Sequence, residues 1–200
     1  VCIVDAELTL SCPPSVTAAS GMDALVQAIE SYVSVHAVAT TEALSLEAAR
    51  MIGRSLPVAC EDGADLPARA AMAEASFMAG LALGSARAGA VHGLAHAVGL
   101  RYGLPHGVVC GVLAPHVFRR NASAVGEKYA RLAEAMGGDP ADRAESLLDR
   151  LALPRSVGPY PDAEGERAIM EYALSSGSSR ANPVVVDEAY VRGILEAACT

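Results

Sequence analysis

Residues 92–106, HGLAHAVGLRYGLPH, contain three of the five histidines of this 200-residue chain. His92 and His96 are four residues apart and would share one face of a helix. The segment YGLP (residues 102–105) then turns the chain, because glycine and proline interrupt regular structure. His106 begins the next helical stretch and can fold back toward His92. This stretch therefore predicts two helices joined by a tight turn, with histidines gathered where they meet.

The same helical pattern extends outward in both directions. Apolar residues recur at three- and four-residue steps, which is typical of helices with one buried face. Thr40 or Thr41 can cap one of these helices. Short strands are expected only at residues 1–5 and near residues 184–186. The expected helices cover residues 15–35, 41–56, 68–84, 88–100, 106–120, 127–136, a stretch ending near 175 after a Pro/Gly-rich linker at 154–165, and 187–198.

The fold class expected from this pattern is all-α, a single helical bundle domain over residues 1–200. Residues 1–14 are expected to be a strand and linker that lead out of a preceding domain, because the chain starts on valine and Pro13-Pro14 stop regular pairing. Apolar residues make up 52% of the chain, which is enough for a sizeable core.

Composition excludes several classes of function. The net charge is −8, and Arg119-Arg120 is the longest basic run, so binding of nucleic acid through its phosphates is not expected. No apolar stretch approaches the ~18 residues needed to span a bilayer. Five cysteines are scattered without any CxxC pair, which favours a reduced, cytoplasmic protein.

Known cofactor and nucleophile motifs are also missing. No two glycines are separated by one residue, which excludes the dinucleotide fingerprint GxGxxG. The single lysine, Lys128, follows no glycine-rich loop, so a P-loop is excluded, and GxSxG is absent.

The stretch GMDALVQAIE (residues 21–30) offers a possible partner for the histidines. Asp23 and Gln27 are four residues apart and would share a helix face. Imidazole and carboxylate are common metal ligands, so Asp23 with the histidines indicates a metal site. The alternative is a set of hydrogen-bonded core histidines, and the spacing alone leaves both open. Glu30 is expected to be a solvated helix charge and Cys110 a small buried apolar side chain.

Three segments together resemble a known family. They are VDAELTLSCPPSVTAASGMDAL (residues 4–25), HGLAHAVGLRYGLPHGVVCGVLAPHVFRRN (residues 92–121) and ANPVVVDEAYVRGIL (residues 181–195). In this order they resemble the C-terminal helical domain of the iron-containing (group III) alcohol dehydrogenases, whose relatives include maleylacetate reductases, lactaldehyde and butanol dehydrogenases and, more remotely, dehydroquinate synthase. The resemblance implies a metal-binding helical domain that follows an N-terminal nucleotide-binding domain not contained in this chain.

Residue roles follow from the resemblance. Asp23, His92 and His106 match metal-ligand positions, and His96 matches a histidine that lines the substrate and nicotinamide pocket. Leu8-Thr9-Leu10 match a stretch that touches the cofactor from the helical side. The implied cofactors are Fe²⁺ or Zn²⁺ and NAD or NADP, and the implied partners are a small alcohol or carbonyl substrate, the nucleotide-binding domain or a separate subunit supplying it, and further copies in a homo-oligomer.

Gln27 departs from the family pattern, which has a histidine ligand there. Three outcomes are open. Asp23 and the two histidines can hold a metal, with Gln27 or a water completing the site. The site can be metal-free and still reduce an activated carbonyl, or the chain can be an inactive paralogue.

The expected function is that of the C-terminal part of a metal-dependent NAD(P)-linked alcohol dehydrogenase or carbonyl reductase, an oxidoreductase of the iron-type family. The alternatives are a standalone metal-dependent lyase-type enzyme and a non-catalytic scaffold with a degenerate metal site. The sequence upstream of Val1 would separate them, because a glycine-rich phosphate loop there favours the dehydrogenase.

Overall fold

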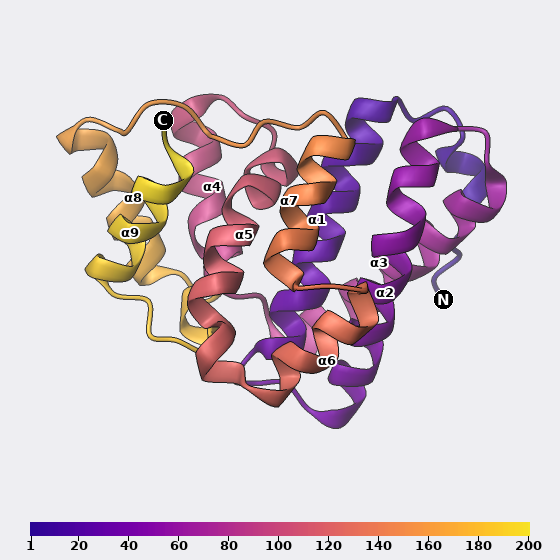
Figure 1. The fold of residues 1–200 in the computed structure, drawn as a ribbon, viewed down its shortest axis with the longest axis horizontal. Coiled ribbons are helices and arrows are strands. Elements are labelled where there is room, and N and C mark those ends of the chain that lie inside the picture. The colour runs from indigo at the N-terminus through magenta and orange to yellow at the C-terminus, as the bar shows by residue number, and fades with distance from the viewer.

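The structure is a computed structural model that describes residues 1–200, and it is built from helices without any strand (Figure 1). This confirms the all-α expectation. The elements are η1 (Ala6–Thr9), α1 (Pro14–Val33), α2 (Ala39–Glu61), α3 (Leu66–Ala86), α4 (Ala90–Tyr102), α5 (His106–Val125), α6 (Glu127–Met136), α7 (Pro140–Arg150), α8 (Ala163–Ser175), η2 (Ser179–Ala181) and α9 (Glu188–Ala198).

Helix α1 lies at the centre of the molecule and organises the rest (Figure 1). It packs against α2 and α3 on one side and against α5 on another, while α4, α8 and α9 extend the bundle beyond α5. Its inner positions are apolar and fully buried, and they include Met22, Leu25, Val26 and Ile29. Burial of this single connected core supplies the main free energy of folding.

Two close contacts between helices depend on glycine. A Cβ atom on Gly107 would lie 2.0 Å from the carbonyl oxygen of Ala19, so α5 approaches the backbone of α1 more closely than a side chain would permit. A Cβ atom on Gly93 would lie 2.1 Å from Ser179 Oγ, so α4 approaches η2 in the same way. The first contact matters for function because it brings the start of α5 against the first half of α1.

Several boundaries differ from the sequence expectations. Residues 1–5 form no strand, η1 follows them, and residues 184–186 are also without a strand. Helix α2 begins at Ala39, where Thr41 Oγ1 accepts a hydrogen bond from the backbone N–H of Val38. It then continues through the buried Pro57, although proline usually ends a helix.

Helix α7 was not expected from the sequence at all. Asp139 caps it by accepting hydrogen bonds from the backbone N–H groups of Ala141 and Asp142, and Pro140 occupies its first turn. An acidic cap followed by proline is a recognised helix start. Leu147 and Leu148 of this helix are buried in the core beside α5.

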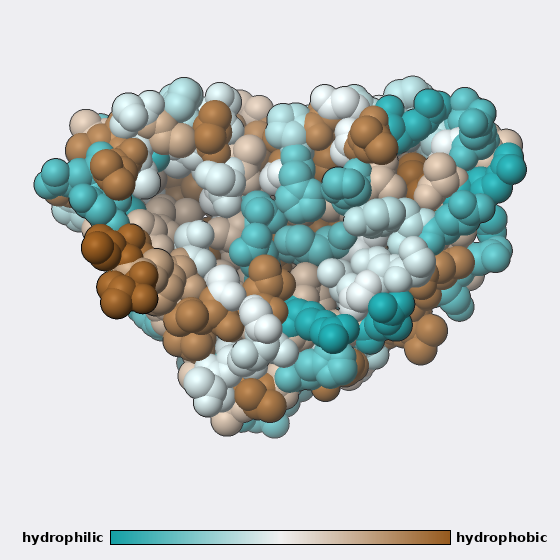
Figure 2. Space-filling model, turned by 180° about the vertical axis from the view of Figure 1, so that it is seen from behind, coloured by the Kyte–Doolittle hydropathy of each residue, from teal (hydrophilic) through white to brown (hydrophobic).

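The face of the molecule opposite to that of Figure 1 carries an apolar area. Seen from behind, apolar side chains gather at the edge that holds the N-terminal segment (Figure 2). Exposed apolar residues of this segment and of α3 include Val1, Ile3, Leu8, Phe77 and Leu81. None of the helices combines the length and the apolar character that crossing a membrane would require.

Candidate metal centre

Four potential ligand atoms meet where α1, α4 and α5 come together. They belong to Asp23 of α1, His92 of α4, and His106 and Cys110 of α5, and they all lie within 4.8 Å of one another. The structure therefore brings together the three residues that were expected to meet, and it adds a cysteine.

Distances within the cluster are those of direct polar contacts. His92 Nε2 lies 3.1 Å from Asp23 Oδ1, and His106 Nε2 lies 3.6 Å from the same oxygen. The two imidazole rings are 5.6 Å apart between centroids. Cys110 Sγ lies 3.5 Å from His106 Nε2.

The turn after α4 and the glycine contact at α5 create this geometry. Gly103 ends α4 in the left-handed conformation, with φ of 66°, and Pro105 precedes the first residue of α5, His106. His106 thus starts a helix whose second residue, Gly107, touches α1. As the sequence suggested, His106 folds back beside His92.

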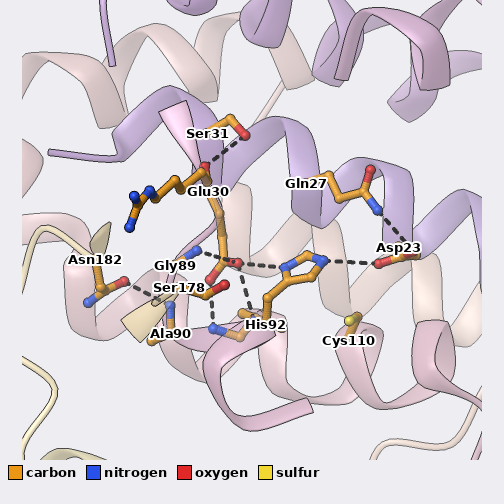
Figure 3. Close-up of polar contacts among 12 residues, drawn as sticks. Asp23, Gln27, Glu30, Ser31, Gly89, Ala90, His92, Cys110, Ser178 and Asn182 are labelled. Carbon is orange, nitrogen blue, oxygen red and sulfur yellow. Dashed lines mark hydrogen bonds and ion pairs between the residues drawn. The ribbon is translucent and has the colours of Figure 1, made fainter. Parts of the chain in front are cut away.

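Gln27 does not join the cluster in the way that was expected. It lies on the same face of α1 as Asp23, but its Nε2 donates a hydrogen bond to Asp23 Oδ2 at 3.0 Å. Figure 3 shows the Gln27 amide oxygen turned away from Asp23 and His92. Gln27 therefore holds the second carboxylate oxygen of Asp23 and leaves Oδ1 for the histidines.

Glu30 corrects the sequence expectation of a solvated charge, because it is only 2% exposed. Its Oε2 lies 2.7 Å from His92 Nδ1 (Figure 3). The same carboxylate accepts hydrogen bonds from the backbone N–H groups of Gly89, Val91 and His92 at the start of α4. A carboxylate that binds the far nitrogen of a ligand histidine fixes the ring and its tautomer.

Cys110 is buried, as expected, yet it is more than a small apolar side chain because its sulfur faces the polar cluster (Figure 3). The sequence contained signals for both missed residues. Glu30 follows Asp23 by seven residues, which places it on the same helix face two turns on, and Cys110 follows His106 by four.

Burial and charge set the protonation of the metal-free cluster. Burial alone would lower the pKa of His92, but hydrogen bonds and charges from Asp23 and Glu30 outweigh it and raise the pKa to about 10. Burial also opposes ionisation of Asp23, yet the bond to His92 and the charges of both histidines hold the pKa of Asp23 below its usual value. Burial raises the pKa of the Cys110 thiol, and burial lowers the pKa of His106.

His96 lies beside the cluster rather than in it. It is exposed, its ring stacks on Tyr172 at 5.4 Å between centroids, and it separates two hollows. The first, about 350 Å³ in volume, is lined by His96, Leu100, Leu104 and His106 among others. The second, about 560 Å³ in volume, is lined by His96, Tyr172 and residues from α4 and α8.

Leu8, Thr9 and Leu10 lie apart from these hollows. Leu8 is 80% exposed and Leu10 is also exposed. Thr9 lines a separate hollow of about 190 Å³ with Cys12 and the buried Arg69. The structure shows no contact between these three residues and the metal cluster.

The donor set of the cluster fits a divalent transition metal. One carboxylate and two imidazoles with open positions are a recognised set for Fe²⁺, and imidazole, carboxylate and thiolate all bind Zn²⁺.

Comparison with known proteins shows which family the chain belongs to. Residues 17–199 match the C-terminal domain of the Fe-containing alcohol dehydrogenase family. The chain belongs to this family. It is 38% identical over 211 residues to 1,3-propanediol dehydrogenase of Klebsiella pneumoniae, an alignment that covers 99% of this chain and 54% of that protein. The chain thus spans about half the length of the curated relatives it matches.

Solved structures agree with the sequence match. A 1,3-propanediol oxidoreductase superposes with a TM-score of 0.90 at 36% identity, over 97% of this chain and 54% of that one. Sulfoacetaldehyde reductase from Bifidobacterium kashiwanohense, solved in complex with NAD⁺, superposes with a TM-score of 0.89 at 27% identity, over 97% of this chain and 53% of that one. The family that the three sequence segments resembled is confirmed, and so is its helical domain.

Proposed function

We propose that the chain is the metal-binding part of an NAD(P)-linked alcohol dehydrogenase or carbonyl reductase, with its metal centre at Asp23, His92 and His106. The observation that carries the proposal is the meeting of these three side chains around Asp23 Oδ1. Bound there, a divalent metal would supply a Lewis acid that polarises the oxygen of an alcohol or carbonyl.

The residues of the chain would position the substrate and move its proton. The hollow of about 350 Å³ touches His106 and is within the size range of small-molecule sites. Leu100 and Leu104 give it apolar walls suited to a short carbon chain. His96 lines both hollows, so it can accept the hydroxyl proton during oxidation and return it during reduction.

The nicotinamide nucleotide would come from an N-terminal domain or a separate subunit. The chain has no dinucleotide fingerprint, the matched relatives are about twice its length, and one of them was solved with NAD⁺. The exposed apolar side chains at the N-terminal segment and α3 suit a contact with such a domain, and Leu8, Thr9 and Leu10 would face the cofactor from this side.

The test uses the full-length protein that contains this chain. Oxidation of ethanol, 1-propanol and 1,3-propanediol is followed by NADH or NADPH absorbance before chelation, after chelation, and after return of Zn²⁺ or Fe²⁺. We expect chelation to abolish turnover and metal to restore it. His106→Ala should lower the rate by about 100-fold or more, because the Lewis acid contributes several kcal/mol.

His36→Ala is the matched control, because His36 is also exposed and lies outside the cluster. It should leave the rate unchanged. Turnover that survives both chelation and His106→Ala would contradict the proposed function. Metal binding without any nicotinamide-linked turnover would instead favour a non-redox enzyme or an inactive paralogue.

A further inference from the structure

The face of α1 that meets the histidines offers one metal-binding oxygen and no nitrogen ligand. Gln27, the residue one turn from Asp23, uses its amide nitrogen to bind Asp23 Oδ2 at 3.0 Å. An amide N–H₂ group donates hydrogen bonds and has no lone pair for a metal. In this arrangement α1 offers only Asp23 Oδ1 to the cluster, and a further protein ligand would come from another helix.

Cys110 is the side chain that the structure places in this position. Its sulfur is one of four potential ligand atoms within 4.8 Å of one another, and the residue is fully buried. His106 and Cys110 form an i, i+4 pair on α5, facing Asp23 on α1. The pair thus contributes one nitrogen and one sulfur to the same point.

The spacing of the four atoms is close to that of tetrahedral coordination. Bond lengths of ~2.0–2.3 Å to nitrogen, oxygen and sulfur imply ligand-to-ligand separations of ~3.3–3.8 Å. Three of the six separations are 3.1 Å for His92 to Asp23, 3.6 Å for His106 to Asp23 and 3.5 Å for His106 to Cys110, and all six are within 4.8 Å. Small movements of the side chains would therefore complete the site.

We propose that Cys110 is a metal ligand, so that the centre consists of Asp23, His92, His106 and the Cys110 thiolate and prefers Zn²⁺ over Mg²⁺ or Mn²⁺. This rests on the proposed function only in placing a divalent metal here, and the substrate oxygen of that function would bind as a fifth ligand. When the sulfur–metal bond forms, the S–H bond breaks and its proton leaves to the solvent, with no change of oxidation state. A thiolate is a soft donor, and soft donors select zinc over the hard cations.

A thiolate ligand has a direct spectroscopic signature. Co²⁺ added to the metal-free full-length protein should produce the near-ultraviolet charge-transfer band of a cobalt–thiolate bond together with the visible bands of tetrahedral cobalt. Cys110→Ser should remove the ultraviolet band and weaken Zn²⁺ binding by about 10-fold or more, since removing even an outer partner of a metal ligand typically costs about 10–100-fold.

Two controls separate the contributions of the neighbouring residues. Cys60→Ser changes a cysteine outside the cluster and should leave band and affinity unchanged. Gln27→Ala removes the amide and should keep the ultraviolet band. X-ray absorption of the zinc-loaded parent needs no variant and should show one sulfur neighbour at ~2.3 Å.

The outcomes distinguish this inference from the proposed function. Cobalt bound without the charge-transfer band, a band that survives Cys110→Ser, or failure of the parent to bind cobalt at all would overturn the assignment of Cys110. A band that is present in a protein without nicotinamide-linked turnover would support Cys110 as a ligand and contradict the dehydrogenase.

Discussion

Glu30 Oε2 lies 2.7 Å from His92 Nδ1, and the same carboxylate binds three backbone N–H groups at the start of α4. One buried side chain of α1 thus fixes both the helix that carries His92 and the orientation of its ring. A carboxylate at a helix N-terminus is stabilised by the helix dipole as well as by these bonds. Gly89 makes room for it, because a Cβ there would lie 2.8 Å from Glu30 Oε1.

Glu30→Gln tests this double role. Glutamine keeps the shape of the side chain but loses its negative charge. Its N–H₂ group would lie against hydrogen-bond donors, the backbone N–H groups at the start of α4 or the His92 ring, that the carboxylate now binds. We expect Zn²⁺ affinity to fall about 10–100-fold, as for other partners of ligand histidines. The free energy of unfolding should fall by about 1–3 kcal/mol, because charge-assisted bonds in a buried place are lost. Zinc titration calorimetry and urea unfolding measure the two effects.

Glu74→Gln is the control, because it makes the same change at an exposed position of α3. Neither quantity should change in this variant. Parent-like zinc affinity in Glu30→Gln would mean that the carboxylate only caps α4 and does not orient His92.

Much of the fold could be predicted because its helices follow local rules. The apolar spacing indicated α6 at its observed bounds, Glu127–Met136, and the Gly-Pro turn indicated the break between α4 and α5. Helix α7 was missed although Asp139 and Pro140 mark its start. The expected helix over 41–56 was too short, because the packing of α2 against α1 and α3 keeps the helix intact through Pro57 to Glu61.

In the candidate site, too, some features could be predicted from local sequence and others depend on how the helices pack. The i, i+4 spacing and the turn could bring His106 toward His92, and family resemblance pointed to Asp23. The roles of Glu30 and Cys110 depend on which helices touch, and α1 and α4 are joined through Glu30 across about sixty residues of sequence. The sequence spacing places Glu30 on the helix face of Asp23 and Cys110 on that of His106, but it does not show that α4 packs against the face of α1. Without this contact, a charged helix residue and a lone cysteine look ordinary.

Gly107→Ala should disturb the contact between α1 and α5. The new Cβ would lie 2.0 Å from the backbone oxygen of Ala19, which cannot move as a side chain can. The helices must separate, and we expect a loss of about 1–3 kcal/mol in the free energy of unfolding. Zinc binding should weaken as well, because His106 and Cys110 move with α5 away from Asp23.

Gly80→Ala is the control for Gly107→Ala. It makes the same change inside a helix, but nothing lies within 4 Å of the new Cβ. It should stabilise the protein by about 0.5–1 kcal/mol, since alanine is the better helix former. Thermal and urea unfolding compare the two. A Gly107→Ala variant as stable as Gly80→Ala would show that α1 and α5 are not in close backbone contact.

Arg87 holds a backbone conformation that favours glycine, with φ of 64° and ψ of 176°. Its carbonyl oxygen accepts a hydrogen bond from Ser31 Oγ at 3.1 Å, which helps fix the turn into α4. Strain of this kind costs of order 1–3 kcal/mol. Arg87→Gly should therefore raise the free energy of unfolding by about 1 kcal/mol after the added flexibility of the unfolded glycine is subtracted.

Arg87→Ala removes the same exposed side chain and keeps the strain, so it should leave stability near that of the parent. Urea unfolding of the three proteins under one condition gives the comparison. Equal stability of the glycine and alanine variants would mean that the strain in the turn is no larger than the entropy cost of glycine, against the expected gain.

The metal-free protein should lose stability as the pH rises above neutrality. The pKa of His92 is raised to about 10, whereas an unfolded histidine has a pKa of ~6.5. Between these values the folded state keeps a proton that the unfolded state has lost, so stability is fully present below pH ~6.5 and declines as the pH approaches 10. The slope should reach up to about 1.4 kcal/mol per pH unit. At the acid end, the lowered pKa of Asp23 gives a contribution that is lost as the pH falls through it.

Urea unfolding with a chelator present, measured from pH 6 to pH 10, gives this profile. His92→Gln should flatten the alkaline slope because it removes the titrating group that faces Asp23, Glu30 and His106. Saturating Zn²⁺ should flatten it in the parent, since the metal takes the place of the proton on His92. A metal-free parent with the same slope as His92→Gln would show that His92 is not held protonated by its two carboxylates.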